Sequence, residues 1–546
     1  MDPESTQNPS HWRSLLSSWL ESQAGPPAGE ATAQSVIAAL RQGWVPTELA
    51  FRVGLRLLAR EPQFESALQT AATGSLDQVD QAVDERAVIE KLSNPLFTAL
   101  LGYCLMTSPE IERLLTRLRR HLLRSVSNAP TSIDPVPREL CLALAMQCFL
   151  NEYVFEETAE ESVWVKNLEA NLRKAVQDAL AVDDYALAIL AAYRPLDRLD
   201  WAQPAYTANT AGLNQLKAIF IDQPKMETES ATDILTLTAP GNVTSEHVQR
   251  QYDENPYPRW VTCARESPMA FYDFAMTMKR NYAVPSTPSY TNSKPEILIA
   301  GCGTGMQAIQ CASQYTDAAI TAIDLSRPSL AYALRKTREH QIPNINYAQA
   351  DLLHLADLPE FQGRFDFVEC LGVLHHLVDP SHGLNVLAKC LRPGGLMYLG
   401  VYSATARSSI IAGRKLIAQH ALAPTADGIK QFRKLVLASI GQPGDQARKL
   451  RPLTHFIDFY SISMCRDLVF HVQEHQFRPK EILALAQGAG LSLLGFGIAD
   501  AKAANLYAAR NPGDRYVRDV AKITAFEREF PQTFAAMYPV ILHKPA

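Results

Sequence analysis

Apolar residues in the first 225 positions recur with the spacing of α-helices, and prolines interrupt the series. One run has apolar side chains three or four residues apart, at Val165, Leu168, Leu172 and Val176. It follows Thr158-Ala-Glu-Glu161, which has the form of a helix capping box. We therefore predict an all-α N-terminal domain over residues 1–225. No fixed repeat is evident, and an irregular helical solenoid remains an open alternative.

From Lys294 onward, short apolar runs alternate with helical stretches. The runs predict strands over residues 297–300, 319–323, 345–349, 365–371 and 396–402. Helices are predicted between them over residues 306–314, 328–340 and 381–391, the second capped by Ser326. Strands that alternate with helices predict a parallel, doubly wound sheet.

After Tyr402 the pattern predicts a long helical stretch over about residues 405–488. Two apolar runs, Leu491–Ile498 and Ala504–Ala509, are predicted to be strands that close the sheet. The tail, Val517–Pro545, is predicted to be helical and partly irregular.

Composition favours an ordinary globular protein, because 47% of the 546 residues are hydrophobic and 20% are charged. A net charge of -5 argues against a nucleic-acid partner. The nine cysteines form no CxxC pair, which is typical of reduced thiols in a cytoplasmic protein. The N-terminus does not have the pattern of a signal peptide, and no apolar run is long enough for a membrane span.

The strongest chemical signal is the turn Gly301-Cys302-Gly303-Thr304-Gly305, which lies between the first predicted strand and its helix. Glycines allow the backbone to turn sharply and to approach a ligand closely. A dinucleotide-binding fingerprint would place Gly or Ala at position 306, where this chain has Met306. Acids end the next two strands, Asp324 at 19 residues after Gly305 and Asp351 before Leu352.

This ordered set resembles the class I S-adenosylmethionine-dependent methyltransferases. The resemblance covers residues 294–402 closely and continues loosely to residue 510. It implies that S-adenosyl-L-methionine is the cofactor, with its methionine end on the glycine turn, its ribose on Asp324 and its adenine near Asp351. The cofactor-binding residues implied are Gly301, Cys302, Gly303, Thr304, Gly305, Asp324, Leu325, Asp351, Leu352 and Leu371. The alternative is a domain of the same fold that binds another nucleotide or none.

The resemblance implies a fold of the α/β class, a Rossmann-like methyltransferase sheet with an all-α N-terminal domain and a helical insertion and C-terminal extension. We accordingly divide the chain into five parts. These are the helical domain 1–225, a linker and lid 226–290, the cofactor-binding core 291–402, a helical insertion with closing strands 403–510, and a tail 511–546.

One departure from the family pattern concerns the strand before the glycine turn. Many relatives carry an acid there that meets the ammonium group of the cofactor, whereas this chain has Leu298, Ile299 and Ala300. The ammonium group must then meet backbone carbonyls or another acid. Glu369, near the end of the fourth strand, is a candidate whose direction the strand alternation leaves open.

The segment Gln251–Trp260 precedes the core and contains three aromatic residues, two prolines and an arginine. We expect it to form a lid, with Tyr252, Trp260 and Arg259 contacting the substrate and Tyr257 taking part in catalysis. It resembles a Tyr-Asp-Glu segment in bacterial methyltransferases that carry extra helical domains. A related branch includes protein lysine methyltransferases that act on bacterial surface proteins. An ordinary packed connector is the alternative.

Histidines supply the candidate catalytic bases. His375 and His376 follow the fourth strand, at the edge where ligands bind in such sheets, and His376 is the favoured base of the two, with His375 as a substrate contact. His471 is a second candidate, oriented by Asp467 if both lie on one helix. His471 and His475 have helical metal-ligand spacing, but a third ligand is missing from the motif and we expect no metal. Packing is the alternative for all of these histidines.

The sequence thus predicts a methyltransferase that acts on a nitrogen or oxygen nucleophile. The leading interpretation is that the acceptor is a protein side chain. The first alternative is a small-molecule acceptor, with the helical domain as a scaffold or homodimer interface. The second is a non-catalytic interaction protein with a methyltransferase fold.

Overall fold

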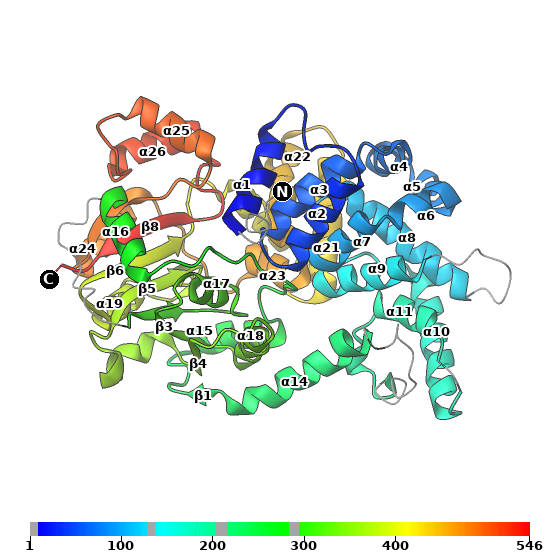
Figure 1. Ribbon diagram of the computed structural model, residues 1–546, viewed down its shortest axis with the longest axis horizontal. Coiled ribbons are helices and arrows are strands. Elements are labelled where there is room, and N and C mark those ends of the chain that lie inside the picture. The colour runs from blue at the N-terminus through cyan, green and yellow to red at the C-terminus, as the bar shows by residue number, and fades with distance from the viewer. Residues whose placement is uncertain are drawn as a thin grey trace. The chain divides into compact units, whose positions relative to one another are not determined.

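The computed structural model describes residues 9–127, 137–180, 182–202, 214, 216–282 and 294–545. The chain forms two compact units (Figure 1). The first comprises Met1–Met226, Arg259–Glu266 and Leu416–Leu468, and the second comprises Glu227–Pro258, Ser267–Lys415 and Val469–Ala546. Residues 283–290 of the predicted lid lie outside the described residues.

Helices make up the first unit, and its described residues contain no strand, as predicted for the N-terminal part of the chain. Its helices are α1 (Pro9–Glu21), α2 (Glu30–Arg41), α3 (Thr47–Leu58), α4 (Pro62–Thr73), α5 (Leu76–Asp84), α6 (Arg86–Leu92), α7 (Pro95–Tyr103), α8 (Pro109–Ser127), α9 (Arg138–Leu150), α10 (Ala159–Gln177), α11 (Asp184–Ala191), α21 (Ala426–Ile440) and α22 (Asp445–Leu450). Short turns of helix are η2 (Leu196–Arg198), η3 (Ala218–Asp222), η8 (Arg451–His455) and η9 (Ile457–Tyr460). Three helices begin in one unit and end in the other, namely α14 (Gln223–Ser230), α20 (Ser408–Gln419) and α23 (Ile462–Phe470).

A buried ion pair joins the late segment of this unit to its early helices. Arg433 of α21 donates two hydrogen bonds, of 3.0 and 2.5 Å, to the two carboxylate oxygens of Glu112 on α8. Its Nε also donates to the carbonyl of Phe459, at 2.6 Å. Burial removes the Arg433 and Glu112 charges from water, which is costly unless each charge has a partner. The two hydrogen bonds between them, and the third from Arg433 to a carbonyl, supply those partners. The segment Leu416–Leu468 is therefore tied to helices more than 300 residues earlier.

We predict that Glu112→Gln destabilises the protein by about 3–5 kcal/mol, because it leaves the Arg433 charge buried without its counter-ion. Urea unfolding followed by circular dichroism measures the shift of the midpoint. The matched control is Glu156→Gln, which removes the ion pair between Lys434 and Glu156, also formed between an early and a late segment of the unit. The side chains of Lys434 and Glu156 are 67% and 59% exposed. Loss of this exposed pair should therefore lower the free energy of unfolding by only about 0–1 kcal/mol. Equal midpoints for the two variants would contradict the argument.

The second unit is built on one sheet of eight strands in the order β1-β4-β3-β2-β5-β6-β8-β7 (Figure 1). The strands are β1 (Leu235–Thr236), β2 (Glu296–Ala300), β3 (Ala319–Asp324), β4 (Ile345–Gln349), β5 (Phe365–Leu371), β6 (Leu391–Val401), β7 (Ser492–Phe496) and β8 (Tyr538–His543). All neighbours pair in parallel except β8, which is antiparallel to both β6 and β7. The crossover from β4 back to β5 makes β2 and β5 the switch point where ligands bind in such sheets.

Helices cover both faces of the sheet, which confirms the doubly wound architecture (Figure 1). One face packs against α19 (Pro380–Cys390), α24 (Pro479–Gly488) and α26 (Val520–Glu529). The other packs against α16 (Phe271–Tyr282), α17 (Met306–Gln314) and α18 (Arg327–Glu339). The unit also contains α15 (Val243–Glu254), α25 (Ala501–Arg510), η4 (Ala231–Asp233), η5 (Leu352–Asp357), η6 (Pro359–Phe361) and η7 (Leu374–His376).

The prediction for the closing strands is half wrong. Leu491–Ile498 contains β7, but Ala504–Ala509 lies inside the helix α25, whose first turn is capped by Asp500 accepting from the backbone N–H of Ala503 at 2.7 Å. The second closing strand is β8, in the tail that we predicted to be helical and irregular. Pairing on both sides, with β6 and β7, makes the Tyr538–His543 run a strand despite Pro539.

None of the helices in the described part of the chain combines the length and the apolar character needed to cross a membrane. All nine cysteines are buried free thiols.

Candidate active site

The glycine turn lies at the carboxyl end of β2, in the middle of the sheet. Gly301, Gly303 and Gly305 all have positive φ, at 79°, 51° and 82°, a region that other residues rarely adopt. A Cβ on Gly303 would lie 2.6 Å from the carbonyl oxygen of Tyr257, and one on Gly301 would overlap the side chain of Val373. The turn therefore needs glycine both for its conformation and for the close approach of two other segments.

The lid segment is held directly on this turn. The backbone N–H of Thr304 donates to the carbonyl of Tyr257 at 3.2 Å, and the Thr304 hydroxyl donates to the carbonyl of Pro258 at 2.6 Å. Thr304 is fully buried, and Cys302 beside it is nearly so. Burial raises the pKa of the Cys302 thiol well above its usual value, with the Asp324 carboxylate raising it further, so the thiol stays neutral.

Asp324 ends β3 and faces the turn. Its Oδ2 accepts from the backbone N–H of Gly303 at 2.8 Å, and its Oδ1 accepts from that of Ser326 at 2.9 Å. The backbone N–H of Leu325 also interacts with this carboxylate. A carboxylate has about four acceptor positions, so backbone donors do not use all of them. Burial raises the pKa of Asp324 most, the backbone N–H groups of Ser326 and Gly303 lower it, and the nearby carboxyl of Asp253 on α15 raises it. Leu325, next in the chain, accepts through its carbonyl from the side-chain amides of Gln249 and Gln349.

Asp351 follows β4 and is almost completely buried. Its Oδ1 caps η5 by accepting from the N–H of Leu353 at 3.0 Å, and its Oδ2 accepts from the N–H of Gly241 at 3.0 Å. Thr238 also accepts from the N–H of Asp351, at 2.8 Å. The acid therefore holds the segment around residues 238–241 against the end of β4. Leu352 is buried beside it, and Leu371 is half-buried at the end of β5.

Histidines gather beyond the ends of β5 and β6. The ring of His376 stacks on that of His471, with centroids 3.5 Å apart and planes 19° from parallel. His375 is fully buried with its ring stacked on Tyr402 at 3.7 Å, and neither of its ring nitrogens has a hydrogen-bond partner among the described residues. The hydroxyl of Tyr252 lies 3.4 Å from Nε2 of His471, and the Tyr252 ring is 6.3 Å from that of Tyr257.

The backbone of Gln473 assigns the tautomers of the stacked pair. His376 Nδ1 is 2.8 Å from the Gln473 carbonyl, which accepts only, so this nitrogen carries a proton. His471 Nδ1 accepts from the Gln473 N–H at 3.1 Å, so its proton is on Nε2, toward Tyr252. Burial and the neighbouring His376 lower the pKa of His471 well below its usual value, and burial lowers that of His375 in the same way. His471 and His375 are therefore neutral near pH 7.

The prediction that His471 and His475 share a helix is wrong. α23 ends at Phe470, so neither histidine lies on a helix and the expected helical spacing is absent. Asp467 belongs to the first unit and His376 and His471 to the second, so the orienting role of Asp467 stays a prediction. The expectation of no metal also stays a prediction. The Gln473 backbone also orients the His471 ring, a contact that the side-chain pattern did not indicate.

Tyr252 and Tyr257 lie with the glycine turn in the second unit, whereas Arg259 and Trp260 belong to the first unit. There the Arg259 guanidinium lies 4.4 Å from the centroid of the Phe149 ring and donates to the Phe149 carbonyl at 3.4 Å. Trp260 is 4% exposed. Substrate roles for Arg259, Trp260 and His375 remain predictions.

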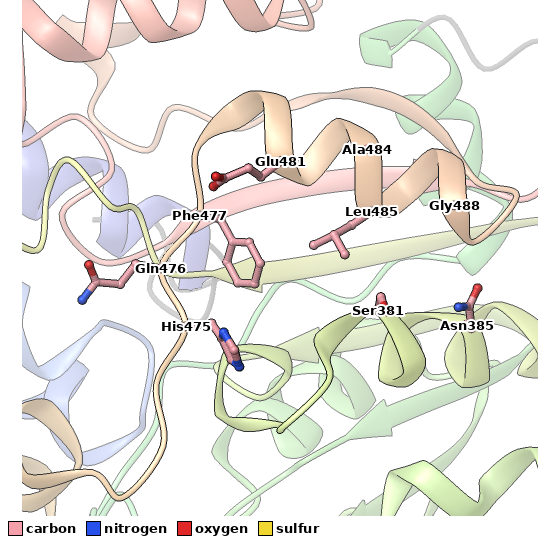
Figure 2. Close-up of a pocket in the computed structure, with 9 residues that line it drawn as sticks. All are labelled: Ser381, Asn385, His475, Gln476, Phe477, Glu481, Ala484, Leu485 and Gly488. Atoms are coloured by element: carbon pink, nitrogen blue, oxygen red, sulfur yellow. The ribbon is translucent and has the colours of Figure 1, made fainter.

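A groove of about 550 Å³ opens on the second unit between α19 and α24. Figure 2 shows Ser381 and Asn385 on α19 opposite Glu481, Ala484, Leu485 and Gly488 on α24, with His475, Gln476 and Phe477 at one end. None of the site residues predicted from the sequence lines it. It is connected to the histidine cluster through the backbone, where the His475 N–H donates to the His375 carbonyl at 2.7 Å.

This sheet order, with a glycine turn after its central strand and acids after the next two, defines a Rossmann-like cofactor-binding domain. Residues 297–395 match the family model described as a methyltransferase domain. This part of the chain is therefore similar to methyltransferase domains.

The chain resembles several known proteins over part of its length. It is 30% identical over 265 residues to an uncharacterized protein of Synechococcus sp., covering 48% of this chain and 62% of that protein. It is 29% identical over 143 residues to the ubiquinone biosynthesis O-methyltransferase of Paracidovorax citrulli, covering 26% and 58%. The chain thus spans about three fifths of the length of these relatives. Among solved structures, PKMT2 from Rickettsia typhi in complex with AdoHcy aligns with a TM-score of 0.39 and 20% identity, over 50% of this chain and 52% of that one.

We predict that Gly303→Ala lowers the affinity for S-adenosylhomocysteine at least tenfold, because the new methyl group displaces the Tyr257 carbonyl from the turn. Isothermal titration calorimetry measures the change. Gly363→Ala is the matched control, since Gly363 has a similar φ of 59° but a Cβ added there would meet nothing within 4 Å. Both variants carry the same backbone strain, so an equal loss of affinity in the two would refute a specific role for the Tyr257 contact.

Proposed function

We propose that the protein transfers the methyl group of S-adenosyl-L-methionine to a nitrogen or oxygen nucleophile. One observation carries the proposal: contacts run without a break from the cofactor turn to a candidate base. Gly303 and Thr304 hold Tyr257, whose ring is near Tyr252, and Tyr252 is near His471, which stacks on His376. The binding element and the base therefore lie on one edge of one compact unit.

In this proposal the cofactor lies across the carboxyl ends of β2, β3 and β4. Gly301, Gly303 and Gly305 admit its methionine end beside the N-terminus of α17, Asp324 accepts from the ribose hydroxyls, and Asp351 with Leu352 lies at the adenine. Asp324 keeps acceptor capacity beyond its backbone donors, which suits a ribose hydroxyl. The bound cofactor supplies an electrophilic methyl group on a sulfonium.

Bound there, the cofactor would supply its methyl group to the acceptor atom and would leave as S-adenosylhomocysteine. A nucleophile that carries a proton must lose it, and in this proposal the His376 ring, whose Nδ1 is held by the Gln473 carbonyl, accepts it. His471 keeps the His376 ring in place by stacking and directs its own N–H toward Tyr252. The products are the methylated acceptor, S-adenosylhomocysteine and a protonated histidine that releases its proton to solvent.

The acceptor is either a protein side chain, as the sequence first suggested, or a small molecule, as for the relatives named ubiquinone biosynthesis O-methyltransferases. Incubation of a cell lysate with methyl-labelled cofactor and the protein, followed by separation by size, tells the two apart. We expect label in the macromolecular fraction. Label found only among small molecules would show that the methyl acceptor is a small molecule and not a protein.

Cofactor binding is the first test of the proposal. We predict that wild-type protein binds S-adenosylmethionine with micromolar affinity and that Asp324→Ala weakens binding by ten- to a hundredfold, since a charged hydrogen-bond acceptor is lost. Calorimetric titration measures both constants. Binding no tighter than millimolar in the wild type, unchanged in the variant, would favour the non-catalytic alternative.

The base is tested separately from the binding site. We predict that His376→Gln lowers the initial rate of methyl transfer by about 10²–10⁴-fold, the usual contribution of a general base. The dissociation constant for S-adenosylhomocysteine should stay within twofold, because His376 does not hold the cofactor. His475→Gln is the matched control, from the same cluster but with its side chain in the flanking groove. A rate for His376→Gln equal to that of the control would remove His376 from the mechanism.

A further inference from the structure

The methionine end of S-adenosylmethionine carries an ammonium group, which needs a negative partner when it is removed from water. Related methyltransferases commonly supply an acid from the strand that precedes the glycine turn. Here that strand ends in Leu298, Ile299 and Ala300, all of which are 0–1% exposed. The strand itself therefore offers only backbone groups to the ammonium.

An acid is present at the same level on the neighbouring strand. Glu369 of β5 is in register with Ile299 of β2 in the parallel pairing of the two strands. Phe367, two residues earlier on β5, packs in one core cluster with Ile297 and Ile299, while Val368 and Cys370 pack on the opposite face. Alternation along a strand then places the Glu369 side chain on the Ile299 face. This answers the question of direction that the sequence left open.

The contacts of Glu369 place its carboxylate at the start of α17. Its Oε2 accepts from the side-chain amide of Gln307, at 2.6 Å, and Gln307 is the second residue of this helix. α17 begins immediately after the glycine turn, where the methionine end of the cofactor lies in the proposed function. Among the described residues, no Lys, Arg or His forms an ion pair with Glu369. The site thus holds an acid without a cation, beside the place where a cation is expected.

The titration of this acid is unusual. Burial raises the pKa of Glu369 to about 7, although the hydrogen bond from Gln307 lowers it. The other titratable groups that face it are the thiol of Cys311 on α17 and the phenol of Tyr398, its register partner on β6. Burial raises the pKa of both above their usual values, and the phenol of Tyr282 on α16 near Tyr398 is shifted in the same direction. Glu369 is therefore the group of this set that changes charge near neutral pH.

We propose that Glu369 binds the ammonium group of the cofactor, replacing from β5 the acid that relatives carry on the strand before the glycine turn. This inference rests on the proposed function, since it assigns a residue to the cofactor site named there. Gln307 acts as a positioning residue that keeps the carboxylate turned toward the turn.

The assignment predicts a pH dependence of a definite sign. An ammonium bound to Glu369 favours the ionised carboxylate, so binding lowers the pKa of Glu369 and releases a proton when the free site is protonated. At pH 8 the free site is mostly ionised and affinity is at its maximum. At pH 6 only about one site in ten is ionised, so the apparent dissociation constant rises about tenfold.

The experiment compares two ligands that differ in the ammonium group. S-adenosylhomocysteine carries it, whereas 5′-methylthioadenosine has the same adenosine and thioether but no amino-acid end. Glu369→Gln preserves the shape of the side chain and can still accept from Gln307. We expect this variant to bind S-adenosylhomocysteine about 10–100-fold more weakly at pH 8, the loss of one charge-assisted contact. We expect its affinity for 5′-methylthioadenosine to stay within twofold, and its S-adenosylhomocysteine affinity to be nearly independent of pH between 6 and 8.

Controls separate a ligand contact from a structural role. Glu360→Gln removes an exposed glutamate and should leave both affinities unchanged. Gln307→Leu removes the hydrogen bond to Glu369 and keeps the charge. If Glu369 only held α17 in place, Glu369→Gln and Gln307→Leu would weaken both ligands alike, and that result would overturn the assignment.

The failures of the two proposals are distinguishable. Wild-type protein that binds neither ligand contradicts the proposed function itself. Wild-type protein that binds both, with an unchanged preference for S-adenosylhomocysteine in Glu369→Gln, contradicts only the role of Glu369.

Discussion

The close approach of the Tyr257 carbonyl to Gly303 is the contact on which the candidate site depends. It brings the segment before the sheet onto the turn after β2, and Thr304 fixes it there with two further hydrogen bonds. The absence of a Cβ at Gly303 makes this approach possible. The consequence reaches the histidines, because Tyr257 positions Tyr252 and Tyr252 lies against His471. One backbone contact thus joins the cofactor turn to the place where the acceptor reacts.

Half-buried acids that form no ion pair among the described residues give the same edge of the sheet its electrostatic character. Asp324 has only backbone N–H groups as described donors, and Glu369 has only an amide. Burial raises the pKa of both acids, because a carboxylate loses solvation without gaining a countercharge. The opposite arrangement occurs in the first unit, where the buried Glu112 carboxylate accepts two hydrogen bonds from Arg433. Burial raises the pKa of Glu112 as well, although Arg433 lowers it. The difference is that Glu112 has a counter-ion, whereas Asp324 and Glu369 have none among the described residues. This contrast is the physical reason for assigning Asp324 and Glu369 to the cofactor.

Local sequence was enough to predict several elements of the second unit. The strands Ile345–Gln349 and Phe365–Leu371 and the helix Met306–Gln314 have the predicted bounds. Glycines help at two of these bounds, since Gly372 follows the second strand and Gly305 precedes the helix. β8 was missed since Pro539 interrupts its pattern, and only pairing with β6 and β7 makes it a strand. The glycine turn and the two acids could be found from their spacing. The Tyr257 carbonyl and the Gln473 backbone could not, because a main-chain group acts in the same way whatever side chain it carries.

The stacked histidines show how main-chain groups decide chemistry. The N–H and the carbonyl of Gln473 bind the two Nδ1 atoms and so impose opposite tautomers on rings 3.5 Å apart. That segment is itself held by a buried pair, in which Arg407 donates to both carboxylate oxygens of Glu474, and by Arg414, which donates to the His471 carbonyl. The same arginines, together with burial, help to keep His471 uncharged. In the proposed function, a neutral His471 ring therefore does not compete with His376 for the proton of the acceptor. The pair is therefore better suited to a single proton transfer than two equivalent histidines would be.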